Sequence, residues 1–253
     1  MKIYLINLDR HPDRLAHMRG QLGDLAFERA PAIDGLNLPP AAKGLSPFEL
    51  ACLESHKAAW RLFLESADNY ACFLEDDLHV WPGFAALIGS ETWIPEDAHS
   101  VKLDTYLQAV ALGERRPAIG GRDLARLYSR HQSSAAYILS REGARRYLEL
   151  TADAAAPADY ALFPTQPRRV GLRIYQLIPA IAIQDHLLPA DQGGRSFATG
   201  MAGADTSVPP RRSSPLEKFG RESVRLARQV ADLGEWAYQK AILRLKTATV
   251  GVG

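Results

Sequence analysis

The chain has 253 residues, enough for one large α/β domain or two small ones, and its 47% apolar content can fill a substantial core. A formal net charge of +1 excludes a protein that binds nucleic acid through a strongly basic overall charge, so we expect no nucleic-acid partner. Cys52 and Cys72 lie in apolar segments and are expected to be buried free thiols in a reducing compartment. The first apolar run is too short for a signal sequence or a membrane span, which favours a soluble, cytoplasmic protein.

The N-terminal segment predicts a strand over Ile3–Leu8, followed by a helix from Pro12 to about Leu22. Polar residues gather where this strand ends and the helix begins: Asn7, Asp9, Arg10 and Arg14. The positive end of a helix beside arginines is a suitable place to hold an anion. A solvated helix face explains the arginines equally well.

A second short strand is expected near Phe27–Ala30, and it leads to Asp34-Gly35. Asp-Gly is first of all a turn signal. A carboxylate at Asp34 that contacts a nucleotide base or ribose is the alternative interpretation.

The next element is a helix with a well-formed start. Ser46 is the expected N-cap, Pro47 takes the first position, and Glu49 closes a capping box. Apolar residues recur at helical spacing as far as Leu64, which indicates a face packed on the core. His56 lies on this helix, where it is either a structural residue or a ligand-binding one.

The most informative stretch begins with the apolar run Ala71–Leu74, which suits a central strand. Glu75, Asp76 and Asp77 follow it and should emerge at the carboxyl end of that strand, where open α/β sheets place their ligands. Adjacent carboxylates repel one another unless a cation lies between them, and they are hard ligands of the kind that Mg²⁺ and Mn²⁺ prefer. An acidic loop that caps a helix is the alternative.

Further elements follow in alternation. Residues 81–84 indicate a turn into another helix, and Val101–Leu103 a strand that brings Lys102 and Asp104 toward the same sheet end. Residues 111–123 carry glycines, a proline and interleaved charges, and we expect a loop without a core of its own.

A strand over Ala135–Leu139 then ends at Ser140, a suitable N-cap for a helix over Arg141–Leu150. Alternating strands and helices with short connections predict an α/β sandwich around a mostly parallel sheet.

The C-terminal part has a different composition. Residues 187–214 are rich in Gly, Pro and Ser, typical of a linker or of a loop that becomes ordered on ligand binding. Residues 211–246 hold nine lysines and arginines against four acids, with apolar residues at helical spacing. Such a basic amphipathic helix suits an anionic membrane surface, and packing on the rest of the chain or on a second subunit is the alternative. We therefore divide the chain into 1–190, 191–214 and 215–253.

Several blocks, in order along residues 1 to 190, resemble those of family 25 glycosyltransferases, the group of bacterial lipooligosaccharide galactosyltransferases. The blocks are Asn7-Leu8-Asp9 with Arg14, Ala32–Gly35, Glu49–His56 with Trp60, Phe73–Asp77, Val101–Asp104, Ala135–Ser140, Pro157–Tyr160, Gln176–Ala180 and Gln184–His186. No single block is decisive, and the resemblance rests on their shared order and spacing.

This resemblance implies a nucleotide-sugar-binding domain of the GT-A type and inverting transfer from a UDP-sugar. It also implies a divalent cation, Mn²⁺ or Mg²⁺, bound by Asp77 and Asp76, with His186 as a further ligand. The cation would neutralise the charge that develops on the UDP leaving group. Asp185, next to His186, is an alternative ligand.

Inversion needs a base that takes the proton of the acceptor hydroxyl. The resemblance makes Asp159 the first candidate, because it lies in the matching Pro-x-Asp segment, and Asp104 the reserve. A helix-capping role is the alternative for Asp159. The residues expected around the donor are Asn7, Leu8, Asp9, Arg14, Asp34, His56, Asp76 and Lys102.

The resemblance thus implies a metal-dependent enzyme that adds a hexose, specifically galactose, to a growing lipopolysaccharide or lipooligosaccharide. Its acceptor would be a glycan or lipid-linked glycan, and residues 215–246 would contact the inner face of the cytoplasmic membrane. Two alternatives stay open: a nucleotidyl- or phosphotransferase that uses the same acids and metal, and a carbohydrate-binding relative without catalysis.

Overall fold

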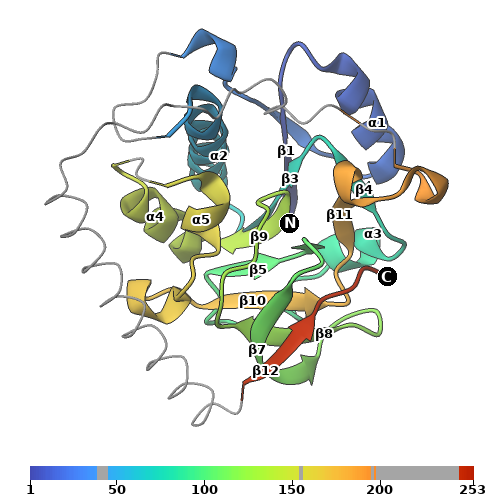
Figure 1. The fold of residues 1–253 in the computed structure, drawn as a ribbon, viewed down its shortest axis with the longest axis vertical. Coiled ribbons are helices and arrows are strands. Elements are labelled where there is room, and N and C mark those ends of the chain that lie inside the picture. The colour runs from blue at the N-terminus through green and yellow to red at the C-terminus, as the bar shows by residue number, and fades with distance from the viewer. Residues whose placement is uncertain (39–44, 154–155, 195–196, 198–244) are drawn as a thin grey trace, which may run out of the picture.

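The computed structural model describes residues 1–38, 45–153, 156–194, 197 and 245–253, and within these residues the chain forms one large and one small sheet (Figure 1). In pairing order the large sheet contains β12 (Lys246–Thr249), β7 (Ala109–Pro117), β8 (Asp123–Leu127), β10 (Ile174–Ile178), β5 (Ser100–Lys102), β9 (Ala136–Ser140), β3 (Tyr70–Glu75), β1 (Lys2–Asn7) and β2 (Glu28–Pro31). The small sheet contains β4 (Leu78–Val80), β11 (Ala182–Gln184) and β6 (Asp104–Thr105).

Helices cover both faces of the large sheet (Figure 1). One face packs against α2 (Pro47–Glu65), α4 (Arg141–Leu150) and α5 (Ala158–Leu162), and the other against α1 (Pro12–Leu22) and α3 (Phe84–Ile88). Short 3-10 turns lie at Gly35–Asn37, Pro167–Val170, Asp185–Leu187 and Ala190–Gln192. Alternation along β1 shows why two cores form: Tyr4 and Ile6 belong to the α2 side, and Ile3 and Leu5 to the α1 side.

The α/β prediction is confirmed, but the prediction of a mostly parallel sheet is wrong. β1 runs parallel to β2 and β3, and β10 parallel to β5. β9 is inserted antiparallel between β3 and β5, and β7, β8 and β12 extend the sheet with antiparallel pairs. A strand buried on both faces is a continuous apolar run in either direction, so its sequence carries no information on its orientation.

Residues 111–123 also differ from the prediction of a loop without a core. They contribute most of β7, which forms an antiparallel hairpin with β8 around Gly120 and Gly121, both at positive φ. Val110 and Leu112 of β7 are buried in the core, whereas Arg115 and Arg116 are exposed. Only the first half of β7 is covered by protein. The second half is exposed and carries charged residues, so its sequence lacks the apolar pattern that would predict a strand.

The predicted helix starts are confirmed. Ser46 Oγ accepts a hydrogen bond from Glu49 N at 3.2 Å, and Glu49 Oε2 accepts one from Ser46 N at 2.7 Å, which completes the capping box of α2. Ser140 caps α4 through Gly143 N at 3.1 Å. α1 begins at Pro12, as its sequence predicts.

Most of the expected linker and basic helix lies outside the described residues, which leave out 198–244. The end of the chain returns to the sheet: β12 pairs antiparallel with β7, and Thr105 Oγ1 donates to Val250 O at 2.6 Å. Residues 246–249 therefore belong to the large sheet, although the predicted division placed them in a separate tail. Among the described residues no helix has both the length and the apolar character to cross a bilayer.

Candidate functional site

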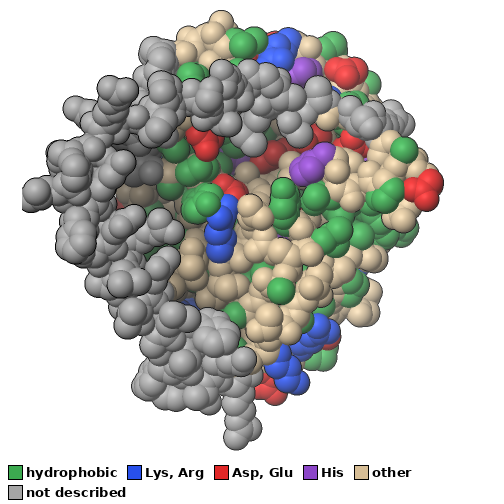
Figure 2. All heavy atoms as spheres, in the orientation of Figure 1, with side chains coloured by type: hydrophobic (Ala, Val, Ile, Leu, Met, Phe, Trp, Pro, Cys, Tyr) green, Lys and Arg blue, Asp and Glu red, His purple; other side chains and the backbone are tan. Residues whose placement is uncertain are grey.

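The three consecutive acids lie at the carboxyl end of β3, as predicted. Glu75 is the last residue of β3, and Asp76 and Asp77 form the turn into β4. Both aspartates are only 7% exposed. Figure 2 shows acidic side chains and a histidine gathered on the face that lies between α2 and α1 in Figure 1. Negative charge is thus concentrated at the carboxyl end of β3, and we call Glu75, Asp76 and Asp77 the acidic edge.

Asp76 is held by the first strand and the first helix. Arg14 Nη1 donates to Asp76 Oδ1 at 3.0 Å, and Asn7 Nδ2 donates to Asp76 Oδ2 at 2.7 Å. Asn7 Oδ1 in turn accepts a hydrogen bond from Arg29 Nε at 2.8 Å. The polar cluster that the sequence places at the end of β1 therefore forms, but Asn7 and Arg14 are buried and use these groups to fix an acid.

Asp77 has a very different environment from its neighbour. Burial, together with the charges of Glu75 and Asp76, raises the pKa of Asp77 to about 7. Gln184 Nε2 lies 3.4 Å from both carboxylate oxygens, which is long for a hydrogen bond. Of the three acids, Asp77 is the one whose ionised form is least stabilised by the protein, so a bound cation would stabilise it most.

Behind Glu75 runs a chain of buried hydrogen bonds. Trp60 Nε1 donates to Tyr137 Oη at 2.8 Å, and Tyr137 Oη lies 2.7 Å from His56 Nδ1. His56 Nε2 lies 3.2 Å from Glu75 Oε1, which also accepts a hydrogen bond from Ser134 Oγ at 2.7 Å. Burial opposes ionisation of Glu75, but these bonds and the nearby charges outweigh it and lower its pKa.

The burial and bonding of His56 favour the structural alternative that the sequence left open. Its side chain is 1% exposed, and both ring nitrogens bond to protein groups. Its contact with the three acids is through Glu75. Cys52, His56 and Glu75 place their ligand atoms within 4.8 Å of one another, but burial raises the pKa of the Cys52 thiol well above its usual range.

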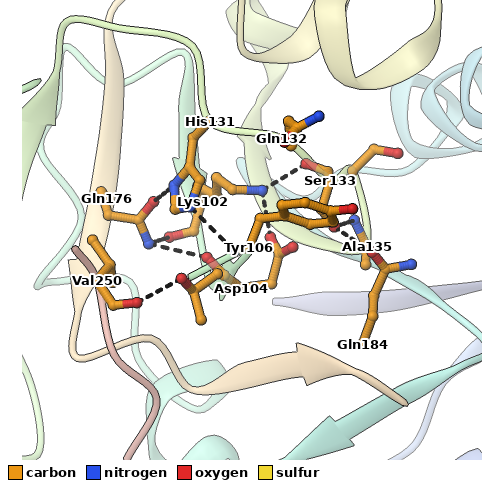
Figure 3. A network of polar contacts seen from close by, with 12 residues as sticks. Lys102, Asp104, Tyr106, His131, Gln132, Ser133, Ala135, Gln176, Gln184 and Val250 are labelled. Carbon is orange, nitrogen blue, oxygen red and sulfur yellow. Dashed lines mark hydrogen bonds and ion pairs between the residues drawn. The ribbon is translucent and has the colours of Figure 1, made fainter. Parts of the chain in front are cut away.

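A second buried network contains Lys102 and Asp104 (Figure 3). Lys102 Nζ donates to Asp104 Oδ1 at 2.8 Å and to Ser133 O at 2.6 Å, and both side chains are fully buried. Burial lowers the pKa of Lys102 and raises that of Asp104, and their mutual attraction opposes both shifts. Asp104 Oδ2 has no hydrogen-bond partner in the described part of the chain.

The same network fixes the segment that precedes β9. His131 Nδ1 lies 2.7 Å from Gln176 Oε1, and His131 Nε2 accepts from Tyr106 N at 3.2 Å. Burial and the charge of Lys102 lower the pKa of His131 to about 3, so the ring is neutral. Ser133, at φ 76°, donates its hydroxyl to Gln184 Oε1 at 2.9 Å (Figure 3). A hydrogen-bonded path therefore joins Lys102 to the amide beside Asp77.

Asp159, the preferred base, lies in the first turn of α5 rather than at its N-cap, which is Pro157. Arg130 Nη2 donates to Asp159 Oδ2 at 2.9 Å, and the Arg130 guanidinium stacks on the Tyr160 ring at 3.2 Å. The Asp159 side chain is 21% exposed. Asp159 is thus reachable from solvent, whereas Asp104 is enclosed.

The other donor candidates form an outer rim. Arg10 binds Asp34 through two hydrogen bonds, at 2.6 Å and 3.3 Å, and this pairing lowers the pKa of Asp34. Asp34 Oδ1 also accepts from Leu36 N at 3.0 Å, so it makes the predicted turn. Asp9 is exposed beside Arg29, and Leu8 is half-buried. Arg29 links Asp9 to Asn7, because it donates to both side chains.

The structure does not bring His186 together with the two aspartates. Among the described residues, Asp76, Asp77 and His186 do not form a group whose ligand atoms all lie within 4.8 Å. The His186 ring lies 6.0 Å from that of Tyr106. Its neighbour Asp185 is buried and bonded, with Oδ1 2.7 Å from His79 Nε2 and Oδ2 accepting from Phe197 N at 3.0 Å.

Comparison with known proteins now identifies the family. The model of glycosyltransferase family 25, described as LPS biosynthesis proteins, matches residues 1–162, which contain most of these polar residues. The chain belongs to glycosyltransferase family 25. This confirms the resemblance drawn from the sequence blocks.

Individual relatives of this family 25 member come from Neisseria species. Lacto-N-neotetraose biosynthesis glycosyltransferase LgtB of Neisseria gonorrhoeae is 28% identical over 211 residues, which cover 73% of this chain and 75% of that protein. LgtE of Neisseria meningitidis serogroup B is 27% identical over 208 residues, 73% and 74% of the two chains. A solved glycosyltransferase involved in glycosylation of the PBCV-1 major capsid gives a TM-score of 0.41 at 10% identity over 76% of this chain and 97% of that one.

The acidic edge of this family 25 protein fits a divalent cation. Burial, and after it the charges of Glu75 and Asp76, raise the pKa of Asp77, and a bound cation would supply the opposite charge that this carboxylate lacks. Its carboxylate oxygens are of the type that Mg²⁺ and Mn²⁺ prefer. Asp77 would bind the ion directly, and Asp76, already held by Arg14 and Asn7, would contact it or its water.

Sequence reasoning missed several residues around this edge. Ser133 and Ser134 contact Gln184 and Glu75 from the segment before β9, and Tyr137 supports His56. Gln184 lies in a block that resembles the family, but its contact with Asp77 depends on how β11 pairs with β4. A run of serines before a strand carries no local signal of these long-range contacts.

Proposed function

We propose that this family 25 glycosyltransferase transfers galactose from a UDP-sugar to a lipopolysaccharide or lipooligosaccharide acceptor, with inversion and with Mn²⁺ or Mg²⁺ at Asp77 and Asp76. Membership of the family supports glycosyl transfer, and its description supports an acceptor of lipopolysaccharide type. Relatives named for lacto-N-neotetraose biosynthesis support a hexose donor. We place the enzyme in the cytoplasm, peripheral to the membrane that carries lipid-linked acceptors.

The observation that carries the proposal is the contrast within the acidic edge. Asp76 has a cationic partner, whereas Asp77 is buried beside two other acids and has a pKa of about 7. Such a carboxylate is destabilised until a cation arrives. A divalent ion there would link the protein to the diphosphate of a nucleotide-sugar and offset charge on the departing UDP.

The rim around Asn7 is the proposed place for the nucleoside end of the donor. Asp34 and Asp9 offer carboxylates that can accept hydrogen bonds from a ribose or a base, and Leu8 offers an apolar contact. Asn7 and Arg14 keep Asp76 in position. Lys102 is fully buried, so in this proposal it contributes through the network that ends at Gln184.

Asp159 remains the proposed base because it is accessible, whereas Asp104 is enclosed and bound to Lys102. In the displacement, the acceptor oxygen forms a bond to the anomeric carbon as the bond to UDP breaks. The electron pair leaves with UDP, and Asp159 takes the acceptor hydroxyl proton. Arg130 donates to Oδ2, so Oδ1 is the oxygen that takes the proton in this proposal.

The test is a thermal-shift screen of the full chain with UDP, GDP, CMP and UDP-sugars, each with Mn²⁺, Mg²⁺ or EDTA. A ligand at 100 times its dissociation constant adds about 2.7 kcal/mol of stability. We expect stabilisation by UDP and UDP-galactose that depends on the metal. Equal stabilisation by all nucleotides, or none by any, would contradict the proposal, and turnover of the nucleotide without a sugar acceptor would support a nucleotidyl- or phosphotransferase.

A further inference from the structure

An aromatic surface lies directly beside the acidic edge. β6 and β11 pair in parallel with Thr105 opposite Ile183, so Tyr106 and Gln184 follow one residue later on neighbouring strands. Gln184 approaches Asp77 to 3.4 Å. Figure 3 shows Tyr106 on the same side of the network as Gln184 and Ser133. The small sheet therefore brings an aromatic ring next to the proposed reaction centre.

Tyr106 is part of a larger surface. Its ring lies 6.0 Å from that of His186 at an interplanar angle of 54°, and the next residue, Leu107, is 46% exposed. We call Tyr106, Leu107 and His186 the aromatic rim. None of the three belongs to either hydrophobic core. A tyrosine, an imidazole and an exposed leucine together form an apolar platform with polar edges.

The aromatic rim is held in a fixed and strained shape. Leu107 has φ 54°, in the left-handed region that a leucine rarely adopts. Thr105 Oγ1 accepts from Leu107 N at 3.0 Å, and Tyr106 N donates to the His131 ring. Gln108 binds the opposite segment, with Nε2 donating to Arg130 O at 3.1 Å. Strain at an exposed apolar residue brings no packing gain, and such strain is found preferentially at ligand-binding sites.

We propose that the aromatic rim binds the acceptor, with a hexopyranose ring of the acceptor glycan stacked on Tyr106. A pyranose has one face of C–H groups and an edge of hydroxyls. The negative face of an aromatic ring attracts the weakly positive C–H groups, while the Tyr106 hydroxyl and the nearby amides can bind the hydroxyls. The inference rests on the proposed glycosyl transfer and deepens it by assigning the acceptor side of the same site.

Position supports an acceptor rather than the donor. The nucleoside rim around Asn7 and Asp34 adjoins β1 and α1, whereas the aromatic rim belongs to the ends of β6 and β11. Asp77, just after β3, lies between the two, and Gln184 at the end of β11 approaches it to 3.4 Å. A donor bound through its diphosphate at Asp77 would thus have its nucleoside on one side and the acceptor platform on the other.

The experiment measures binding of methyl β-glucoside, methyl β-galactoside and methyl β-N-acetylglucosaminide by saturation-transfer NMR, with UDP and diamagnetic Mg²⁺ present. The wild-type chain is compared with Tyr106→Ala and with Tyr106→Phe, which keeps the ring. We expect at least one glycoside to bind the wild type, about tenfold weaker binding to Tyr106→Ala, and affinity within about threefold for Tyr106→Phe. A thermal shift with UDP and Mn²⁺, measured on each variant, should be unchanged.

The two arms separate the acceptor assignment from the proposed function. Equal glycoside affinity in Tyr106→Ala, or no glycoside bound by the wild type, would overturn the assignment of the aromatic rim even if UDP binds normally. Absence of any metal-dependent UDP shift in the wild type would overturn the donor proposal. In that case, glycoside binding that depends on Tyr106 would still support a glycan site on the aromatic rim. Parallel loss of the UDP shift in Tyr106→Ala would show a structural role and contradict the inference.

Discussion

Two polar clusters at the same end of the sheet differ in charge balance: one pairs a cation with an acid, and the other holds three neighbouring acids. Lys102 and Asp104 are fully buried, and each has the other as an oppositely charged partner. The acidic edge places Glu75, Asp76 and Asp77 in a row, and Asp77 is left with a raised pKa. A balanced pair needs no further ligand, whereas a surplus of one charge favours binding of a ligand of the opposite charge.

The two clusters are nevertheless joined. Lys102 fixes Ser133, Ser133 binds Gln184, and Gln184 approaches Asp77. The balanced pair therefore supports the position of the group that faces the unbalanced acid. This arrangement predicts that disturbing the first cluster costs stability, while disturbing the second costs binding.

The largest expected effect comes from breaking the balanced pair. Lys102→Met leaves Asp104 buried without its cation and should lower the free energy of unfolding by about 3–5 kcal/mol. Urea denaturation followed by circular dichroism measures this loss. The double variant Lys102→Met with Asp104→Leu, which removes both charges, should recover most of it. A loss in the single variant below about 1 kcal/mol would show that the pair is not a structural element.

The second effect is a pH dependence carried by Asp77 in EDTA. Because its pKa is raised from 3.8 to about 7, the folded protein retains a proton that the unfolded chain releases between these values. This contribution lowers stability as pH rises through that window, by at most roughly 1.4 kcal/mol per pH unit. Asp77→Asn removes it, so the variant should gain stability relative to wild type from pH 4 to 7. Parallel urea-denaturation profiles would contradict this environment for Asp77.

A smaller loss of stability is expected when the buried Arg14 is replaced, and a still smaller one for the exposed Arg10. Arg14→Gln removes the cation that binds Asp76, and we expect a loss of about 1.5–3 kcal/mol together with weaker UDP binding that still depends on metal. Arg10→Gln is the matched control, because the Arg10–Asp34 pair is on the surface and should contribute under about 1 kcal/mol. Equal losses of stability in the two variants, or a UDP thermal shift in Arg14→Gln equal to that of wild type, would remove Arg14 from the site.

The smallest effect lies away from both clusters. Ser46→Ala removes the side-chain cap of α2 and should cost about 1 kcal/mol. Urea denaturation measures this loss, and the UDP thermal shift should be the same as in wild type. A change in metal-dependent UDP binding would show that α2 as a whole, and not only His56, controls the acidic edge.

Local signals explain what the sequence could predict. The caps at Ser46 and Ser140 and the acids after β3 depend on residues next to one another in the chain, so their patterns are readable. The antiparallel direction of β9 and the strand character of β7 depend on which neighbours cover them. The contacts of Ser134 with Glu75 and of Gln184 with Asp77 join residues 59 and 107 positions apart, and no local pattern encodes them.

The candidate site divides in the same way. Asp76 and Asp77 were predicted from the motif, and the structure places both at the sheet edge. His56 was expected to approach the donor, but Tyr137 and Glu75 enclose it. His186 was assigned to the metal; its ring lies 6.0 Å from that of Tyr106, and its role at the metal stays a prediction. A histidine's role depends on what surrounds its two nitrogens, which the sequence does not show.

The most direct test of the account is isothermal titration of UDP into wild type and Asp77→Asn, each with Mn²⁺ and with EDTA. We expect UDP to bind the wild type at least about tenfold more tightly with Mn²⁺ than with EDTA, and Asp77→Asn to lose this difference while remaining folded. If UDP binds Asp77→Asn with the same metal dependence as wild type, Asp77 is not the cation site and the central claim is wrong.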